Sequence, residues 1–173
     1  VHNALCFDRA AGLMSPAQRG RLSILREFTL QACRRANRVV VQTQTMQGYF
    51  SQYPQIRGNV SHILHARTLG AAEGESSFTS TTKPRLLYVG SELPFKDTVT
   101  LYGALSLLPD TECVLIGNWE PLEVHPNATW VGHVAQPTLW AHYRDADVVV
   151  VTSLCESLGL PLLEAMEIGR AHV

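Results

Sequence analysis

Charged residues are scarce in this chain, and the two signs nearly cancel. The 173 residues include 14 Lys and Arg against 15 Asp and Glu, which gives a formal net charge of -1. This balance argues against a nucleic-acid partner, because binding one requires a basic surface that neutralises phosphates. Apolar residues make up 46% of the chain, which is ordinary for a soluble globular protein.

The sequence also lacks long apolar runs and paired cysteines. No stretch of about 18 apolar residues occurs that could span a membrane, and no secretory leader is recognised. The four cysteines form no C-x-x-C pair, which disfavours a disulfide framework or a zinc site and favours a reducing cytosol. The glycosylation sequons at Asn59 and Asn127 are therefore interpreted as coincidence.

The first third of the chain predicts one long helix and two short strands. Apolar residues at helical spacing over 20–36 predict an amphipathic helix, with an apolar face of Leu22, Leu25, Phe28, Leu30 and Cys33. Its basic face suits either a solvated surface or an anionic membrane, and contains Arg19, Arg21, Arg26, Arg34 and Arg35. Strands are expected over 38–41 and 59–64, with Thr43 capping a helix over 44–53.

A Gly-, Ser- and Thr-rich segment over 68–84 predicts an inter-domain linker. Beyond it, strands and helices alternate, and Pro161 suits the first turn of the last helix. The expected strands are 85–89, 112–116, 129–131 and 148–152, and the helices are 97–108, 136–146 and one from near Pro161. The helix expected over 97–108 has Val99, Leu101, Leu105 and Leu108 on one side, which is the face expected to be buried. Such alternation predicts an α/β fold with a doubly wound parallel sheet covered on both faces.

Glycines follow three of these strands directly, at Gly90, Gly117 and Gly132. The carboxyl ends of parallel strands are where ligands bind in open α/β sheets, and glycine lets the backbone approach a ligand closely. In the first of these loops, Lys96 is expected to open a helix and to face an anion together with the helix N-terminus. A solvated lysine in an ordinary turn explains the same residues.

Two carboxylates, Glu156 and Glu164, flank a Gly-Leu-Pro segment after the last strand. The two oxygens of a carboxylate suit a pair of neighbouring hydroxyls. The two glutamates therefore predict binding of the ribose and the hexose of a nucleotide sugar. The amides of Leu162 and Leu163 are expected to face the diphosphate between the two sugars. The plain alternative is a loop charge at Glu156 and a helix-dipole partner at Glu164.

The run ESLGLPLLEAM, preceded by VVVVTS, resembles the E-x7-E signature of retaining glycosyltransferases of the GT-B fold, family 4, or glycosyl transferases group 1. YVGSELPFK resembles the diphosphate loop of that family, CVLIGN and WVGHV resemble its next landmarks, and RANRVVVQTQTM resembles the end of its N-terminal domain. The resemblance implies two Rossmann-like domains in the parent protein. Residues 1–67 would end the N-terminal acceptor domain, and residues 85–166 would form the front of the C-terminal donor-binding domain.

The resemblance also implies a role for individual residues. Glu164 would bind the ribose hydroxyls, and Glu156 would bind the donor sugar. Lys96 would neutralise the leaving diphosphate. His2 resembles the active-site histidine near the transferred sugar, with a purely structural histidine as the alternative. The other residues implied at the donor site are Gly90, Ser91, Asn118, Leu162, the backbone at Gly159 and Leu160, and the backbone of Val134, which would meet the base.

Two departures from the family pattern stand out. Ser91 occupies the position where the family usually carries arginine, so the diphosphate clamp loses a bidentate cation. The chain is also short for the family, and both of its ends look cut. Residues 167–173 are expected to be a non-native tail, and the 173-residue chain is expected to be inactive in transfer.

The function implied is transfer of a hexose from a UDP- or GDP-sugar to a glycan or lipid-linked acceptor, with retention of the anomeric configuration. No cofactor or metal is expected, since the sequence offers no D-x-D pair and no ligand cluster. The protein is expected in the cytoplasm, with peripheral association at the inner face of the membrane as an option. The alternatives are a sugar-nucleotide epimerase, a glycogen-type phosphorylase or a non-catalytic nucleotide-binding module.

Overall fold

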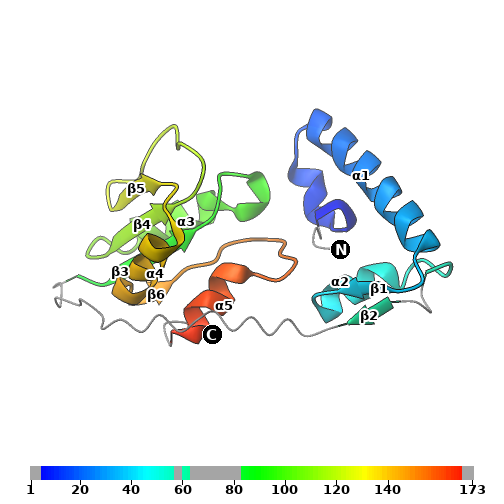
Figure 1. The fold of residues 1–173 in the computed structure, drawn as a ribbon. Helices are drawn as coiled ribbons and strands as arrows, with labels where there is room; N and C mark the ends of the chain where they lie inside the picture. The colour runs from blue at the N-terminus through cyan, green and yellow to red at the C-terminus, as the bar shows by residue number, and fades with distance from the viewer. Residues whose placement is uncertain (1–4, 57–59, 63–82, 169–173) are drawn as a thin grey trace. The chain divides into compact units, whose positions relative to one another are not determined.

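The computed structural model describes residues 5–56, 60–62 and 83–168 (Figure 1). The chain folds as two compact units. Unit 1 comprises Val1–Arg67 with Leu154–Leu158, and unit 2 comprises Thr68–Ser153 with Gly159–Val173. All of the predicted linker except residues 83 and 84 lies outside the described residues, as does the predicted tail beyond residue 168.

Unit 1 opens with two 3-10 turns, η1 (Leu5–Phe7) and η2 (Arg9–Leu13), followed by the long helix α1 (Pro16–Arg35). The helix begins at a capping box. The Ser15 hydroxyl accepts from the Gln18 amide at 3.4 Å, and the Gln18 side chain accepts from the Ser15 amide at 3.0 Å. This reciprocal pair satisfies two backbone donors and starts the helix before the predicted boundary.

The remainder of unit 1 is a small β-α-β arrangement. Strand β1 (Val39–Val41) pairs in parallel with β2 (Val60–His62), and helix α2 (Gln44–Phe50) connects them. The Thr43 hydroxyl accepts from the Met46 amide at 3.2 Å, which confirms the predicted cap. Met46 and Phe50 are fully buried and fix α2 on this sheet.

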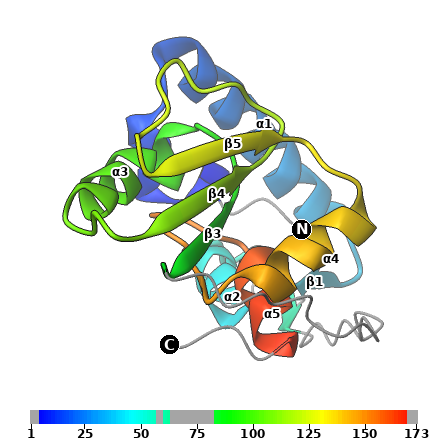
Figure 2. The same ribbon diagram turned by 90° about the vertical axis from the view of Figure 1, so that its left-hand side faces the viewer.

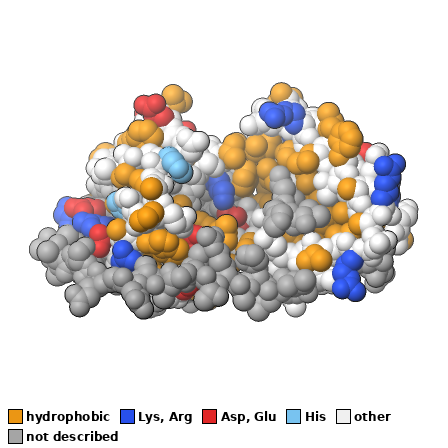
Figure 3. Space-filling view, viewed as in Figure 1, with side chains coloured by type: hydrophobic (Ala, Val, Ile, Leu, Met, Phe, Trp, Pro, Cys, Tyr) orange, Lys and Arg blue, Asp and Glu red, His pale blue; other side chains and the backbone are white. Residues whose placement is uncertain are grey.

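The predicted apolar face of α1 is only partly correct. Leu30 and Cys33 are buried, whereas Leu25 and Phe28 are exposed, with 66% of Phe28 accessible. Figure 3 shows exposed apolar side chains over the α1 region. Within the described part of unit 1, η1 and η2 contact this helix, and two short turns are too small to cover a stripe that runs along 20 residues.

Unit 2 contains a parallel sheet with strand order β5-β4-β3-β6. The strands are β3 (Arg85–Val89), β4 (Glu112–Ile116), β5 (Ala128–Gly132) and β6 (Val148–Val149). The first two match the prediction residue for residue, and β6 is shorter than the predicted 148–152. Leu115 pairs with Trp130 and Ile116 pairs with Gly132, so β5 bulges at Val131.

Helices cover both faces of this sheet, as predicted. They are α3 (Thr98–Ser106), α4 (Gln136–Asp145) and α5 (Leu160–Glu167). Leu87 belongs to a buried cluster with Tyr143 of α4 and Ala165 of α5, whereas the neighbouring Tyr88 belongs to a second cluster with Leu101 of α3. Figure 2 shows α3 on one side of the strands and α4 and α5 on the other. Alternating strand residues thus fill two separate cores.

The predicted buried face of α3 needs a correction. Leu101 and Leu105 are buried as expected, but 80% of Val99 is exposed and Leu108 is exposed as well. Val99 lies two residues before Leu101, which places it on the opposite side of a helix with 3.6 residues per turn. Leu108 follows the end of the helix at Ser106.

Backbone contacts tie the glycine-marked loops at the carboxyl edge of the sheet together. The Gly90 amide donates to the Ile116 carbonyl at 2.9 Å, and the Gly117 amide donates to the Gly132 carbonyl at 3.0 Å. A Cβ atom on Gly117 would lie 2.0 Å from the Gly90 carbonyl oxygen and 2.4 Å from Nε1 of Trp119. Only glycine at position 117 permits this approach, because the nearest atom belongs to the backbone and cannot swing aside.

We expect Gly117→Ala to destabilise unit 2 by about 1–3 kcal/mol, the typical cost of forcing an extra group into a packed site. Urea unfolding monitored by tryptophan fluorescence measures the loss. Gly103→Ala is the matched control, since Gly103 lies within α3 with nothing within 4 Å of its added Cβ. That control should gain about 0.5–1 kcal/mol from helix propensity. Equal effects of the two substitutions would contradict the steric account.

Candidate functional site

Four of the predicted site residues lie at one edge of the unit 2 sheet. Gly90 and Ser91 follow β3, Asn118 follows β4, and Val134 follows β5. Because all strands of this sheet are parallel, their carboxyl ends meet at the same edge. The start of α5 follows β6 at this edge, where open α/β folds bind their ligands.

The loop after β3 is fastened to the sheet through its carbonyl groups. The buried Tyr88 hydroxyl lies 3.3 Å from the Ser91 carbonyl oxygen and 3.5 Å from the Lys96 carbonyl oxygen. The Thr152 hydroxyl donates to the same Lys96 carbonyl at 2.8 Å. Side chains from two strand ends therefore fix where this loop presents Ser91 and Lys96.

Lys96 does not open a helix, contrary to expectation. It is the last residue of a 3-10 turn, η4 (Pro94–Lys96), and α3 begins at Thr98 after Asp97. Asp97 is a better N-cap than lysine, because its carboxylate accepts from the Thr100 amide at 3.2 Å. The half-buried Lys96 places Nζ 5.5 Å from the centre of the Phe95 ring, a cation–π distance.

Glu164 is the buried charged residue among those described, with 6% of its surface exposed. The Tyr143 hydroxyl on α4 donates to Oε2 of Glu164 on α5 at 2.8 Å. Burial, together with this carboxylate, raises the pKa of Tyr143 well above its ordinary range, so the phenol keeps its proton and remains a donor. An acid that only complements a helix dipole has no reason to be buried, and carboxylates are rarely buried without a partner.

The start of α5 depends on Gly159. This residue has φ 71°, in the left-handed region that favours glycine. Its carbonyl accepts from the amides of Leu162 at 3.0 Å and Leu163 at 3.2 Å. These two amides therefore close the first helical turn, and their expected role toward a diphosphate stays a prediction. Since Pro161 has no N–H, Leu160 holds the remaining amide of that turn.

The two carboxylates of the E-x7-E pattern belong to different units. Glu156 is half-buried within Leu154–Leu158, which groups with unit 1, and Glu164 lies in unit 2. His2 lies outside the described residues, so its role stays a prediction.

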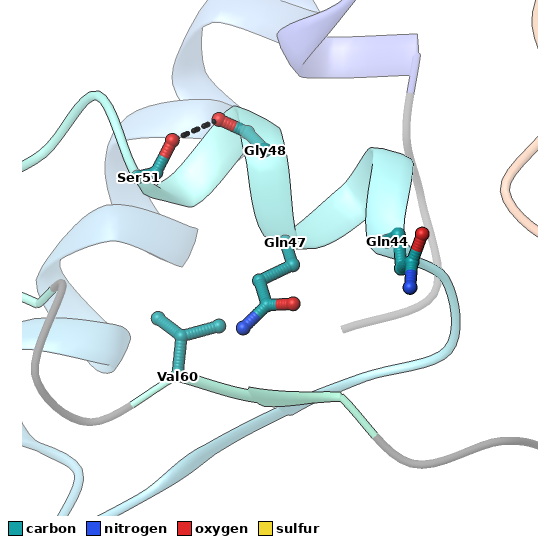
Figure 4. A pocket seen from close by; sticks show the side chains of 5 residues that line it. All are labelled: Gln44, Gln47, Gly48, Ser51 and Val60. Atoms are coloured by element: carbon teal, nitrogen blue, oxygen red, sulfur yellow. Dashed lines mark hydrogen bonds between the residues drawn. The ribbon is translucent and has the colours of Figure 1, made fainter.

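Unit 1 contains hollows that hold none of the predicted site residues. One, of about 450 Å³, is lined by Gln44, Gln47, Gly48, Ser51 and Val60 (Figure 4). Another, of about 500 Å³, is lined by residues that include Asp8, Arg26, Tyr49 and Tyr53. Burial and the neighbouring Asp8 carboxylate raise the pKa of Tyr49 to about 12. The Arg26 guanidinium donates to the Tyr53 hydroxyl at 2.7 Å.

Within the described ranges, no helix has the length and apolarity needed to cross a membrane. The same residues contain no group of three or more His, Cys, Asp or Glu side chains that could hold a metal ion. Two features of unit 2 are thus suited to binding a polar ligand: the buried Glu164 carboxylate, and the fixed backbone groups at the carboxyl edge of the parallel sheet.

Comparison with protein families identifies this arrangement. The family model described as glycosyl transferases group 1 matches residues 72–173, more than half of the chain. The chain belongs to the glycosyl transferases group 1 family. No curated protein matches the sequence. The resemblance found in the E-x7-E segment is therefore confirmed at the level of the family.

Solved structures show where this glycosyltransferase chain stands among known folds. It is similar to sucrose-phosphate synthase from Thermosynechococcus elongatus, with a TM-score of 0.65 and 23% identity over 79% of this chain. A TarM mutant from S. aureus in complex with UDP is similar with a TM-score of 0.66 and 18% identity over 84% of this chain. Anabaena HepE in complex with UDP and glucose is similar with a TM-score of 0.64 and 20% identity over 90% of this chain. These likenesses establish the fold as that of the GT-B glycosyltransferases.

The chain spans less than half of the length of each of these structures, with 40%, 32% and 47% covered. Its structure therefore corresponds to part of a GT-B glycosyltransferase. The activity, substrates and partners of the whole protein are matters for proposal.

Sequence reasoning missed Tyr143 and Trp119 as contributors to the site. Tyr143 occurs in the helix predicted over 136–146, where a buried phenol needs a hydrogen-bond partner. That need predicts that Tyr143 has a partner, but it does not identify Glu164, which is 21 residues away in the sequence. The Trp119 indole donates to the Gly90 carbonyl, 29 residues away in the sequence. No local sequence pattern predicts such a contact.

Tyr143→Phe removes the donor that the buried Glu164 carboxylate accepts from. We expect a loss of about 1.5–3 kcal/mol in the free energy of unfolding, as for hydrogen bonds to charged groups, measured by urea unfolding at neutral pH. Tyr102→Phe is the matched control, because the Tyr102 hydroxyl makes a long, exposed contact of 3.4 Å to a carbonyl. That control should change stability little.

The same pair predicts a pH dependence. Folding raises the Tyr143 pKa above its ordinary value of 10.0, so the unfolded chain loses the phenol proton first as pH rises. The stabilising contribution is complete below about pH 10 and declines above it. The stability difference between wild type and Tyr143→Phe should therefore shrink above pH 10. A difference that stays constant from pH 8 to pH 11 would contradict the assignment.

Proposed function

We propose that unit 2 binds a nucleoside-diphosphate sugar, with uracil or guanine as the base. The whole protein then transfers the hexose to a glycan or lipid-linked acceptor with retention of the anomeric configuration. The observation that carries this proposal is Glu164, a buried carboxylate in helix α5, next along the chain after β6, which accepts a hydrogen bond from Tyr143. Family membership supports it.

Each group at this edge has a task in that reaction. The Glu164 carboxylate accepts hydrogen bonds from the ribose hydroxyls, because the two oxygens of a carboxylate suit a pair of neighbouring hydroxyls. The backbone of Val134, just before α4, meets the base. Asn118, which is exposed after β4, contributes a polar group beside the nucleotide.

The reacting end of the donor involves the remaining predicted residues. The family resemblance assigns the hexose to Glu156 and to the backbone at Gly159 and Leu160. The role of His2, which lies outside the described residues, stays a prediction from that resemblance. Lys96 stabilises the negative charge that develops on the departing diphosphate, which is the main electrostatic task of such a transfer. The carbonyl contacts of Tyr88 and Thr152 keep that lysine in place. No metal ion is required in this scheme, since Lys96 and backbone amides supply the positive charge.

The solved structures favour uridine diphosphate as the first ligand to test. The TarM and HepE structures were solved in complex with UDP, and that of starch synthase IV from Arabidopsis thaliana was solved bound to ADP and acarbose. Among acceptors, a lipid-linked one suits the basic helix α1 at the inner face of a membrane, whereas a free glycan requires no such surface. We place the protein in the cytoplasm in either case.

Isothermal titration of the chain with UDP, GDP and ADP tests the proposal. We expect one nucleotide to bind, and Glu164→Ala to weaken it at least about tenfold, or about 1.4 kcal/mol. Glu164→Gln keeps an acceptor for Tyr143 and should weaken binding with a smaller loss of stability. Glu167→Ala, on the exposed end of the same helix, is the matched control and should bind normally.

A folded wild-type chain that binds none of the three nucleotides would contradict the proposed donor site. Equal weakening by Glu164→Ala and Glu167→Ala would contradict the role of the buried carboxylate. Release of free UDP from UDP-glucose without any acceptor would instead indicate hydrolysis rather than transfer.

A further inference from the structure

Trp119 anchors the peptide group that follows β3. Its indole Nε1 donates to the Gly90 carbonyl at 3.0 Å. The ring is half-buried and packs against the cluster that contains Tyr88 and Leu115. Gly117 leaves room for this contact, because a Cβ at that position would overlap both the carbonyl and the indole.

This anchor sets the direction of the next amide. The Gly90 amide donates to Ile116 of β4, and the Gly90 carbonyl accepts from Trp119 in the loop after β4. Both polar groups of Gly90 therefore face the β4 side of the strand. Since a trans peptide is planar with its C=O and N–H opposed, the Ser91 amide faces the other side. In this sheet β3 lies between β4 and β6, so the Ser91 amide faces the β6 side.

The Ser91 amide lies between two carbonyl groups that are each held by a hydrogen bond. Its own carbonyl is contacted by the Tyr88 hydroxyl at 3.3 Å, so the carbonyl groups on both sides of this amide are held. Among the residues that the structure describes, no hydrogen-bond partner is found for the Ser91 amide. A backbone donor held in one direction at the carboxyl edge of a parallel sheet is suited to an anion.

We propose that Trp119 is a positioning residue that aims the Ser91 amide at the diphosphate of the donor. Ser91 has no charge to offer, so a fixed backbone donor is what this position contributes to binding. The inference rests on the proposed function, because the anion is the diphosphate of the nucleotide sugar. It assigns a role to Trp119, which acts through the Gly90–Ser91 peptide without touching the ligand.

The test compares a ligand that contains the diphosphate with one that lacks it. Trp119→Phe removes the indole N–H and keeps an aromatic ring in the cluster. We expect the affinity for UDP to fall by about fivefold, the loss of one oriented hydrogen bond. The affinity for uridine, measured by chemical-shift titration, should stay within about twofold. GDP and guanosine serve as the second pair.

Trp130→Phe is the matched control. Trp130 lies on the next strand, and its Nε1 is buried without a hydrogen-bond partner among the described residues. Removing that N–H should leave the affinity for both ligands unchanged. Thermal unfolding of each variant establishes that it is folded at the titration temperature.

A second measurement needs no substitution. In the ¹⁵N-labelled wild-type chain, the Ser91 amide resonance should shift on addition of UDP and stay in place on addition of uridine. A Ser91 resonance unmoved by saturating UDP overturns the inference, as does equal weakening of UDP and uridine by Trp119→Phe. A wild-type chain that binds neither UDP nor GDP refutes the proposed function itself. Normal UDP binding with an unaffected Trp119→Phe variant refutes only the role of Trp119.

Discussion

The close approach of the Gly90 carbonyl to Gly117 governs the arrangement of the loops at the carboxyl edge of the unit 2 sheet. A Cβ atom at position 117 would lie 2.0 Å from this oxygen, so no side chain fits there. Because of that approach, the Trp119 indole can reach the same carbonyl. The loops after β3, β4 and β5 are then joined by backbone hydrogen bonds. A binding edge built this way needs little rearrangement when a ligand arrives, which is how preorganised donors gain their strength.

The second feature of unit 2 is a charged side chain, Glu164, that is buried inside the fold. Burying a carboxylate costs free energy that a hydrogen bond offsets only in part, so Glu164 weakens unit 2 relative to an apolar side chain that fills the same space. Residues retained at such a cost tend to serve a function. In a member of the glycosyl transferases group 1 family, the role that we propose for this buried acceptor within α5 is recognition of sugar hydroxyls. Tyr143 holds the carboxylate ready for it.

Sequence reasoning succeeded where the cause was local. Continuous apolar runs placed β3 and β4 without error, and Thr43 capped its helix as expected. It failed where burial depends on what packs nearby: Phe28 and Val99 were assigned to buried faces that the structure leaves exposed. The Tyr143 and Trp119 contacts join residues far apart in sequence, which no periodicity reveals.

The central claim is that the Glu164 carboxylate binds the ribose hydroxyls of a nucleotide, and a double cycle tests it most directly. UDP and 2′,3′-dideoxy-UDP are each titrated into the wild-type chain and Glu164→Gln. If the carboxylate and the hydroxyls interact, removing both lowers the affinity little more than removing either one. The two losses in binding free energy are then not additive. The account predicts this non-additivity. Losses that simply add would show that Glu164 and the ribose act independently, and would contradict the assignment of the site.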